Sequence, residues 1–317
     1  MPLPRAWDGR LAAPVVAAPL FLASGPDLVV ETCRAGLVGT FPALNCRRTE
    51  DYEGWLAEIG ERLRPHASAA PFGVNLVVHR SNGRLADDLA GTVRHRVPFV
   101  VTSLGASAEI VEAVHGYGGT VFHDAVGLPH ARKAIGAGVD GIVAVCAGAG
   151  GHAGTLSPFA LVSELRRVFD GTIAVAGALS DGRQVAAARL LGADLAYMGT
   201  RFLATRESLA AVAHREMIVA SRAEDVVLTA AVSGVPASFL KESLLRSGLD
   251  PNGRRETPGG LDATDAKAWR DVWSAGQGVG SIDDIPTAAE LARRLIAEYR
   301  DALLEASALA CAAGRGG

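Results

Sequence analysis

Residues 139–205 read VDGIVAVCAGAGGHAGTLSPFALVSELRRVFDGTIAVAGALSDGRQVAAARLLGADLAYMGTRFLAT, and they carry the clearest indication of the fold. It contains three apolar runs, Gly141–Cys146, Thr172–Ala176 and Leu195–Met198, which helix-like segments separate. Strands that alternate with helices pair in parallel, because a parallel crossover needs a long connection. The loops after the three strands therefore open on one edge of the sheet, where α/β proteins bind their ligands.

Five earlier apolar runs continue the same pattern, so the chain has eight candidate strands. The five are Pro14–Pro19, Leu37–Phe41, Phe72–Val77, Phe99–Thr102 and Thr120–Phe122. Eight βα units whose loops open in one direction favour an α/β fold of the TIM (β/α)8 barrel type over residues 1–205. An open doubly wound sheet is the structural alternative. The helix-like segments between the runs are Leu28–Arg34, Asp51–Leu63, Arg84–Val93, Ala108–Val114, Pro129–Ile135, Pro158–Val168 and Gly182–Leu191.

The ends of several predicted helices carry signals of their own. Ser157 before Pro158 predicts a helix start with a capping hydroxyl and a proline in the first turn, and Ser180–Asp181 predict the next one. Gly118, Gly138 and Gly192 each predict a helix end, because a left-handed C-cap favours glycine.

After Thr205 the pattern changes, which predicts a smaller, mainly helical region near the barrel mouth. We expect a helical and loop lid over residues 206–285 and a C-terminal helix and tail over residues 286–317. The glycine run SAGQGVGS, with Trp269 and Trp273, is expected to fold back over the mouth. Surface helices that brace the barrel wall are the alternative for Glu207–Pro236. The expected elements are a helix at Glu207–Ser221, a strand-like Ala223–Pro236, a loop at Gly248–Gly260, and helices at Leu261–Ser274 and Thr287–Ala310.

The composition is that of a globular protein: 49% of the 317 residues are hydrophobic, and the net charge is −3 with both signs interspersed. No run approaches the roughly 18 uncharged apolar residues that a membrane-spanning helix needs. No basic patch suggests nucleic acid or an anionic membrane surface as a partner. The four cysteines, Cys33, Cys46, Cys146 and Cys311, have neither CxxC nor metal-ligand spacing, which favours reduced core thiols in a cytoplasmic protein.

The N-terminal stretch LAAPVVAAPLFLAS, which follows Arg5 and Arg10, imitates a signal peptide. Pro14 and Pro19 interrupt it, and without it the eightfold repeat loses its first strand. A barrel-opening strand is therefore the favoured interpretation.

The loop GAGGHAG, Gly148–Gly154, follows the sixth strand. Its glycines fit the dinucleotide-binding pattern G-x-G-x-x-A, but the next helix starts too late for that fold and the loop is sixth in the series. The glycines do expose backbone amides and leave room for a flat ring. His152 lies among small residues with nothing local to pack on, so we expect it to face a ligand and transfer protons. A solvated loop histidine is the alternative.

The turns after strands seven and eight, Ala176–Arg183 and Met198–Phe202, lie where barrels bind phosphate. Gly177, Gly199 and Thr200 offer backbone N–H groups and a hydroxyl, and the positive end of the helix entered at Ser180–Asp181 is expected to point inward. Tight βα turns that need glycine for their geometry are the alternative.

Other residues are placed at the mouth by their position at strand ends. Asn75 ends the third strand, where its amide can bridge the donor and acceptor edges of a heterocycle or form a local turn. Pro19, Leu20 and Phe21 would wall the mouth from the first strand. His123 and Asp124 end the fifth strand as further lining. No HxH, HExxH or carboxylate cluster indicates a metal site.

The segments APLFLASGP, FGVNL, CAGAGGHAG, GALSDGR and YMGTRF, in this order, resemble those of the nitronate monooxygenase family, formerly 2-nitropropane dioxygenases. The similarity covers residues 14–205, and WSAGQGVGSI extends it to Ile282. It implies an FMN-dependent TIM barrel that oxidises nitronates, and in some members nitroalkanes, with O2. The same GGH loop occurs in the related flavin-dependent enoyl-ACP reductases.

The resemblance further implies that His152 is the active-site base and that FMN is the cofactor. The implied phosphate-binding residues are Gly177, Gly199 and Thr200. Two departures from the family pattern are Ala178, where a second glycine is usual, and Gly148, where relatives often carry an acidic residue. The full expected cofactor-binding set is Pro19, Leu20, Asn75, Ala149, Gly150, Gly151, Gly177, Ala178, Gly199, Thr200 and Gln277.

The expected reaction is oxidation of an alkyl nitronate, or of a nitroalkane, with O2 to a carbonyl compound and nitrite. An enoyl reductase that uses NAD(P)H is one alternative, and a catalytically idle flavin-binding barrel is another. The expected partners are a small-molecule substrate and O2. The oligomeric state stays open, with a homodimer as one option.

Overall fold

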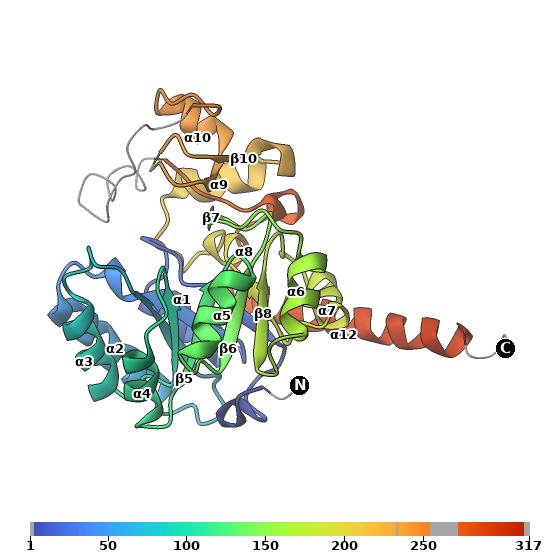
Figure 1. Ribbon diagram of the computed structural model, residues 1–317. Helices are drawn as coiled ribbons and strands as arrows, with labels where there is room; N and C mark the ends of the chain where they lie inside the picture. The colour runs from blue at the N-terminus through green and yellow to red at the C-terminus, as the bar shows by residue number, and fades with distance from the viewer. Residues whose placement is uncertain (1–2, 233, 254–271, 314–317) are drawn as a thin grey trace.

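Eight parallel strands close into a barrel, and helices cover its outside (Figure 1). The computed structural model describes residues 3–232, 234–253 and 272–313. Strand β1 pairs with both β2 and β9, which closes the ring and rules out the open doubly wound sheet. The predicted TIM barrel is confirmed. Its strands are β1 (Val15–Ala17), β2 (Val38–Pro42), β3 (Phe72–Val77), β4 (Phe99–Ser103), β5 (Thr120–Ala125), β6 (Gly141–Val145), β8 (Thr172–Ala176) and β9 (Leu195–Met198).

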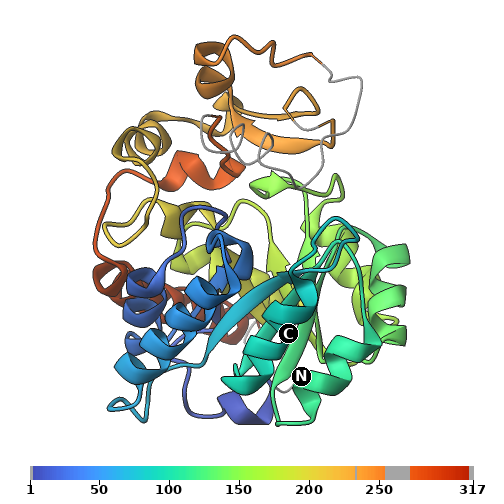
Figure 2. The same cartoon turned by 90° about the vertical axis from the view of Figure 1, so that its left-hand side faces the viewer.

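The crossover helices lie where the sequence pattern places them, and Figure 2 shows them wrapped around the strands below the C-terminal region. The Ser157 hydroxyl accepts a hydrogen bond at the start of α6, and Gly192 ends α7 in the left-handed conformation at φ +106°. Both predicted helix signals are confirmed. The helices are α1 (Pro26–Arg34), α2 (Thr49–Leu63), α3 (Leu85–Arg94), α4 (Ala108–His115), α5 (Leu128–Gly136), α6 (Pro158–Arg166), α7 (Gly182–Leu191) and the short α8 (Thr200–Leu203).

Aromatic side chains fill the lower part of the barrel interior, at the N-terminal ends of the strands. Trp7, in the short helix η1 (Arg5–Trp7), is 1% exposed. Its ring centroid lies 5.0 Å from that of Phe99 and 5.8 Å from that of Phe122. A side chain on Gly73 would meet this cluster, because its Cβ would lie 2.5 Å from the Phe99 ring. Glycine is therefore needed there for the rings to fit.

The C-terminal region above the mouth contains a small antiparallel sheet as well as helices (Figure 1). Its strand order is β10 (Val226–Thr229), β11 (Ala237–Leu240) and β7 (Gly151–His152). Strand β7 belongs to the loop after β6, so the barrel loop supplies one edge of the sheet. The sequence pattern indicated strand-like structure near residues 223–236 but not this pairing. The other elements are α9 (Val212–Ala220), η3 (Ala223–Asp225), α10 (Lys241–Arg246) and η4 (Gln277–Ser281).

Part of the predicted lid lies outside the described residues. This applies to residues 254–260 of the predicted loop, to Trp269, and to most of the predicted helix Leu261–Ser274. Trp273 is described, and its ring stacks on His214 with centroids 5.2 Å apart. The division of the chain at residues 205 and 285 stays a prediction.

The last helix, α12 (Ala288–Ala313), packs on α7 and α1 with its first half and then projects from the barrel (Figure 1). Leu291 and Leu295 are buried against Val185 of α7, whereas Leu304 and Leu309 are 69% and 72% exposed. Cys311, on the projecting half, is exposed, so the expectation of a core thiol is wrong there; Cys33, Cys46 and Cys146 are buried as expected. Among the described residues, no helix is both long and apolar enough to cross a bilayer.

Candidate active site

The loop after β6 is joined to two other segments at the barrel mouth through one carbonyl group. The carbonyl oxygen of Gly148 accepts hydrogen bonds from the backbone N–H of Gln277, at 2.9 Å, and from that of Ala178, at 3.2 Å. Gly148 has φ +86°, a left-handed conformation that favours glycine. The structure therefore brings the sixth loop, the turn after β8 and the glycine run of residues 274–281 together, as the sequence predicted.

Gly150 and Gly151 differ in what surrounds them. A Cβ on Gly150 would lie 2.9 Å from the backbone nitrogen of Gly276, so the close approach of these two segments requires glycine. A Cβ on Gly151 would meet no atom within 4 Å. The backbone N–H of Gly151 donates to the Ser274 hydroxyl at 2.7 Å, and that hydroxyl donates to the Ser238 carbonyl at 2.8 Å. The loop is thus fixed on one side and open on the other.

His152 follows directly and forms the second residue of β7, where it pairs with Ala237 of β11. The C-terminal region thus fixes the backbone of His152, a long-range contact that the sequence did not indicate. The imidazole remains exposed to solvent, yet the surrounding protein atoms lower the pKa of His152 below its usual value by desolvation. The ring is therefore neutral at pH 7, the form in which a ring nitrogen can accept a proton.

The turn after β8 is only partly as predicted. Gly177 has φ +144°, and Ala178 has φ +54°, which is left-handed although the residue is not glycine. The start of α7 is already occupied by protein groups: the Asp181 carboxylate accepts from the backbone N–H of Gln184, and the Glu298 carboxylate from that of Gly182, both at 2.7 Å. The prediction that this positive helix end faces a phosphate is therefore wrong.

The turn after β9 retains the predicted features. Gly199 precedes α8, and Thr200 begins it. The first N–H groups of any helix lack partners within the helix. The buried Thr200 hydroxyl accepts from the backbone N–H of Gly276 at 2.8 Å and keeps its own hydrogen for another acceptor. A Cβ on Gly199 would lie 3.4 Å from a methyl carbon of Leu20, so the predicted wall from the first strand lies beside this turn.

Asn75 is buried near the C-terminal end of β3, and β4 fixes its amide. Its Nδ2 donates to the Val101 carbonyl at 3.2 Å and to the Ser103 hydroxyl at 3.1 Å. The local turn that was the alternative is not what holds it. In the loop after β1, Pro19 lies partly buried before Leu20, and Phe21 is 41% exposed.

Three positioning residues were missed by the sequence analysis. Asn45 accepts from the backbone N–H of Leu22 at 2.8 Å and donates to the Leu20 carbonyl at 3.0 Å, so it fixes the loop after β1. Ser274 and Ser238 connect the sixth loop to the C-terminal region, as described above. Residues 123 positions apart in the chain meet in one of these bonds, and a local sequence pattern carries no signal for such a contact.

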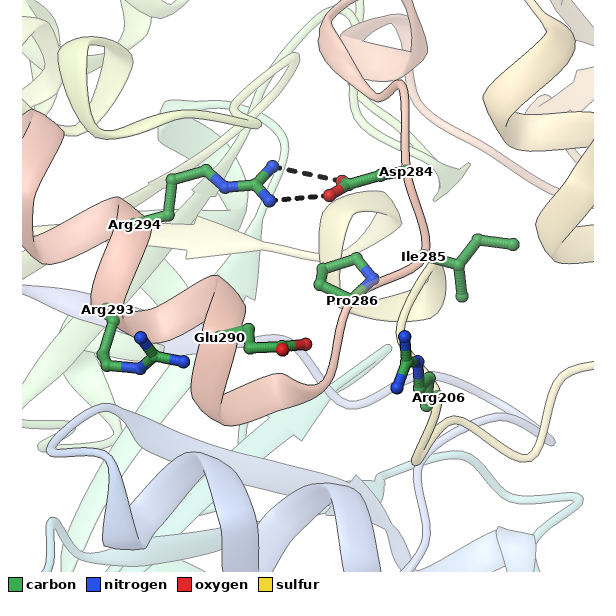
Figure 3. A pocket seen from close by; sticks show the side chains of 7 residues that line it. All are labelled: Arg206, Asp284, Ile285, Pro286, Glu290, Arg293 and Arg294. Carbon is green, nitrogen blue, oxygen red and sulfur yellow. Dashed lines mark hydrogen bonds and ion pairs between the residues drawn. The ribbon is translucent and has the colours of Figure 1, made fainter.

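No group of His, Cys, Asp and Glu side chains within the described ranges is arranged to hold a metal ion. A separate hollow of about 790 Å³ lies at the start of α12 (Figure 3). Charged side chains dominate its lining, and Arg294 and Asp284 form an ion pair within it at 2.6 Å. It contains none of the predicted site residues, so the candidate site rests on the mouth loops. The hollow is lined by Arg206, Asp284, Ile285, Pro286, Glu290, Arg293 and Arg294.

Comparison with known proteins identifies similar chains. The family model described as nitronate monooxygenase matches residues 86–298. The (3aS,4S,5R,7aS)-5-hydroxy-7a-methyl-1-oxo-octahydro-1H-indene-4-carboxyl-CoA dehydrogenase of Rhodococcus jostii is 28% identical over 234 residues, or 74% of this chain. The chain spans 64% of the length of this dehydrogenase and 60% of the length of a second relative, described as a putative monooxygenase of Mycobacterium tuberculosis.

Two solved structures resemble the whole chain. A nitroalkane oxidase from Streptomyces ansochromogenes superposes with a TM-score of 0.78 at 27% identity, over 93% of this chain and 98% of that one. FabK from Thermotoga maritima superposes with a TM-score of 0.80 at 24% identity, over 98% of this chain and 100% of that one. The FabK likeness concerns the fold.

Proposed function

The chain belongs to the nitronate monooxygenase family, a family of flavin-dependent oxidoreductases, and we propose that it uses FMN and O2 to oxidise alkyl nitronates to carbonyl compounds and nitrite. The observation that carries the proposal is the construction of the sixth loop. Gly148–Gly151 is fixed against the glycine run of residues 274–281, and it presents His152 as a neutral imidazole at the barrel mouth.

The mouth residues fit a flavin in three respects. The open side of Gly151 leaves space where a flat ring can approach the backbone. The buried Asn75 amide offers a polar edge that β4 holds in one orientation. The turn of Gly199 and Thr200 offers N–H groups and a hydroxyl hydrogen for a phosphate. The carboxylates at the start of α7 repel an anion, so Gly177 and Ala178 would contribute backbone N–H groups without help from that helix.

The other predicted residues would border the ring. Leu20 and Pro19 would cover it from the β1 side, and Ala149 and Gly150 from the sixth loop. Gln277 would border it from η4, where its backbone is bonded to Gly148. These roles are proposals that follow from position at the mouth.

Bound FMN supplies the electron transfer between substrate and O2. The protein then has two tasks, to orient the substrate and to handle its proton. An alkyl nitronate has already lost its α-proton and needs no base. A neutral nitroalkane must first lose that proton, and in this proposal a ring nitrogen of His152 accepts it.

The reductant test separates this function from the enoyl reductase. Protein loaded with FMN is mixed anaerobically with an alkyl nitronate, or with NADH or NADPH, while the flavin absorbance is followed. We expect fast bleaching by the nitronate and slow or no bleaching by the nicotinamides. Stoichiometric bleaching by NADH or NADPH, with none by nitronates, would reverse the ranking. A flavin that neither donor reduces would favour the idle barrel.

The role of His152 is tested with His152→Asn, which keeps polarity and approximate size. Turnover of a neutral nitroalkane should fall by roughly 10²–10⁴-fold, the usual contribution of a general base. Turnover of the matching pre-formed nitronate should fall much less. The control is His66→Asn, which makes the same change after the end of α2, at the other end of the barrel, and should leave both rates unchanged. Full nitroalkane activity in the His152 variant would show that another group removes the proton.

A further inference from the structure

Asp124 is the one carboxylate among the eight barrel strands. The strands contain only three titratable side chains, those of His123, Asp124 and Tyr197, and no lysine or arginine. His123 faces the outside of the barrel, where its Nδ1 lies 2.8 Å from the Thr102 hydroxyl, so its expected place in the mouth lining is wrong. Burial lowers the pKa of His123 to about 4, and it carries no charge at neutral pH.

Asp124 faces the inside of the barrel. Phe122, two residues earlier in β5, lies in the interior cluster together with Tyr197 of β9. Alternate residues of a strand point to the same side, so Asp124 lies one tier above Phe122, nearer the mouth. Its side chain is only half-buried as a whole, which means that it borders space open to the mouth.

Within the part of the chain that the structure describes, two buried polar atoms at this level have no hydrogen-bond partner. They are Oδ1 of Asp124 and the hydroxyl oxygen of Tyr197. An unsatisfied buried polar atom typically destabilises a fold by about 1–3 kcal/mol. Such atoms are uncommon in native proteins, and one explanation is a ligand that forms hydrogen bonds with them.

The surroundings of Asp124 favour its protonated form. Desolvation raises the pKa of its carboxyl group to about 7. Tyr197 is a neutral neighbour, because burial, with a smaller effect of Asp124 itself, raises the pKa of the phenol well above its usual value. Strands β4 and β6, which flank β5, carry no titratable side chain, and His152 above the mouth is neutral at pH 7. A protonated carboxyl group is a hydrogen-bond donor.

We propose that Asp124 lies beside Tyr197 at the base of the cofactor pocket and binds the flavin there. The carboxyl group of Asp124 is protonated in the complex and donates a hydrogen bond to an acceptor on the flavin. The inference rests on the proposed flavin site. A ring that covers the mouth removes the remaining solvent from Asp124 and raises its pKa further. Flavin binding is then accompanied by uptake of one proton at pH values just above neutrality.

The proposal determines how the dissociation constant for flavin changes with pH. Below about pH 7, Asp124 is protonated with or without flavin, so this group adds no pH dependence to the flavin affinity there. Above that pH the unliganded carboxyl group is ionised and must be reprotonated on binding. The dissociation constant then rises by up to about tenfold per pH unit, until the pH reaches the pKa of the bound form.

The experiment titrates flavin-free protein with FMN between pH 7 and pH 9, followed by FMN fluorescence. This range lies above the second pKa of a phosphate monoester, about 6. Wild type should show the rising dissociation constant, and Asp124→Asn, which mimics the protonated form, should bind with one affinity throughout. Asp301→Asn, an exposed carboxylate on α12, is the matched control and should behave as wild type. Equal slopes in wild type and Asp124→Asn would overturn the inference.

Calorimetry in two buffers of different ionisation enthalpy gives a second readout on wild type alone, in case the variant does not fold. Near pH 8 we expect an uptake approaching one proton per FMN bound, and zero uptake would also overturn the inference. FMN binding without any pH dependence refutes the role of Asp124 and leaves the proposed function intact. Absence of FMN binding at every pH refutes the proposed function, and the inference with it.

Discussion

The lower and upper halves of the barrel interior are built from the same strands but differ in chemistry. In the lower half, Trp7, Phe99 and Phe122 pack ring against ring, with centroids 4.9–5.8 Å apart, and bury no charge. One polar atom there, the indole nitrogen of Trp7, is also without a hydrogen-bond partner within the described part of the chain, but it is neutral and belongs to a side chain that packs on two rings. In the upper half, β5 and β9 carry Asp124 and Tyr197, whose Oδ1 and hydroxyl oxygen have no hydrogen-bond partner among the described residues. The lower half therefore supplies stability, whereas the upper half gives up stability at the edge where the ligand is expected to bind.

The largest effect on the free energy of unfolding is expected for Trp7→Ala, in the lower half. Removing a buried tryptophan typically destabilises a protein by about 3–5 kcal/mol, through lost burial and the cavity that remains. Denaturant unfolding should show a loss of this size, while the FMN affinity of the folded fraction stays near that of wild type. An equal loss of affinity in the folded fraction would show that the two halves do not act separately.

For Asp124→Asn in flavin-free protein we expect a smaller change in the free energy of unfolding, and in the opposite direction: the variant is more stable than wild type. The folded-state pKa of about 7 lies above the unfolded value near 3.9. The wild type is therefore destabilised relative to the variant as the pH rises from about 4 to about 7, and the difference is constant above that. Solvent reaches part of the side chain and the new amide also lacks a partner, so we expect a gain of roughly 1–3 kcal/mol at pH 8. Melting temperatures at pH 4.5 and pH 8 measure it; parallel pH profiles would contradict the raised pKa.

The smallest effect concerns Ala178→Gly in the turn after β8. Ala178 adopts φ +54°, a left-handed conformation that costs a non-glycine residue about 1–2 kcal/mol. Glycine removes this strain but increases the entropy of the unfolded chain. The free energy of unfolding should therefore increase by about 0.5 kcal/mol, which a small rise in melting temperature would show. Ala176→Gly, on the adjoining strand, should destabilise instead, and a loss in both variants would mean that the strain at Ala178 is absent.

The barrel strands could be predicted from the sequence because their signal is local. Each strand is a short apolar run such as Thr172–Ala176, which is buried on both faces and followed by a glycine-bearing turn. The mouth residues could be placed for the same reason, since the end of each run fixes where its loop begins. Whether Asn75, His152 and Thr200 have the proposed roles stays a prediction.

What could not be predicted depends on contacts between distant residues. Glu298 of α12 reaches the start of α7, which reversed the expectation for that helix end. The pairing of β7 with β11 joins two short segments, neither of which carries a strand signal strong enough to indicate its partner. Only the folded barrel brings these groups together.

The attachment of β7 to β11 also has a consequence for the order of events during protein synthesis. A ribosome releases the chain from its N-terminus at about 5–20 residues per second. All eight barrel strands have been made by Met198, but the Gly151–Ser274 bond joins residues 123 positions apart. The loop that carries the candidate base therefore waits roughly 6–25 seconds after its own synthesis before its anchor exists. All eight barrel strands are therefore available before the residue that anchors the proposed catalytic loop has been made.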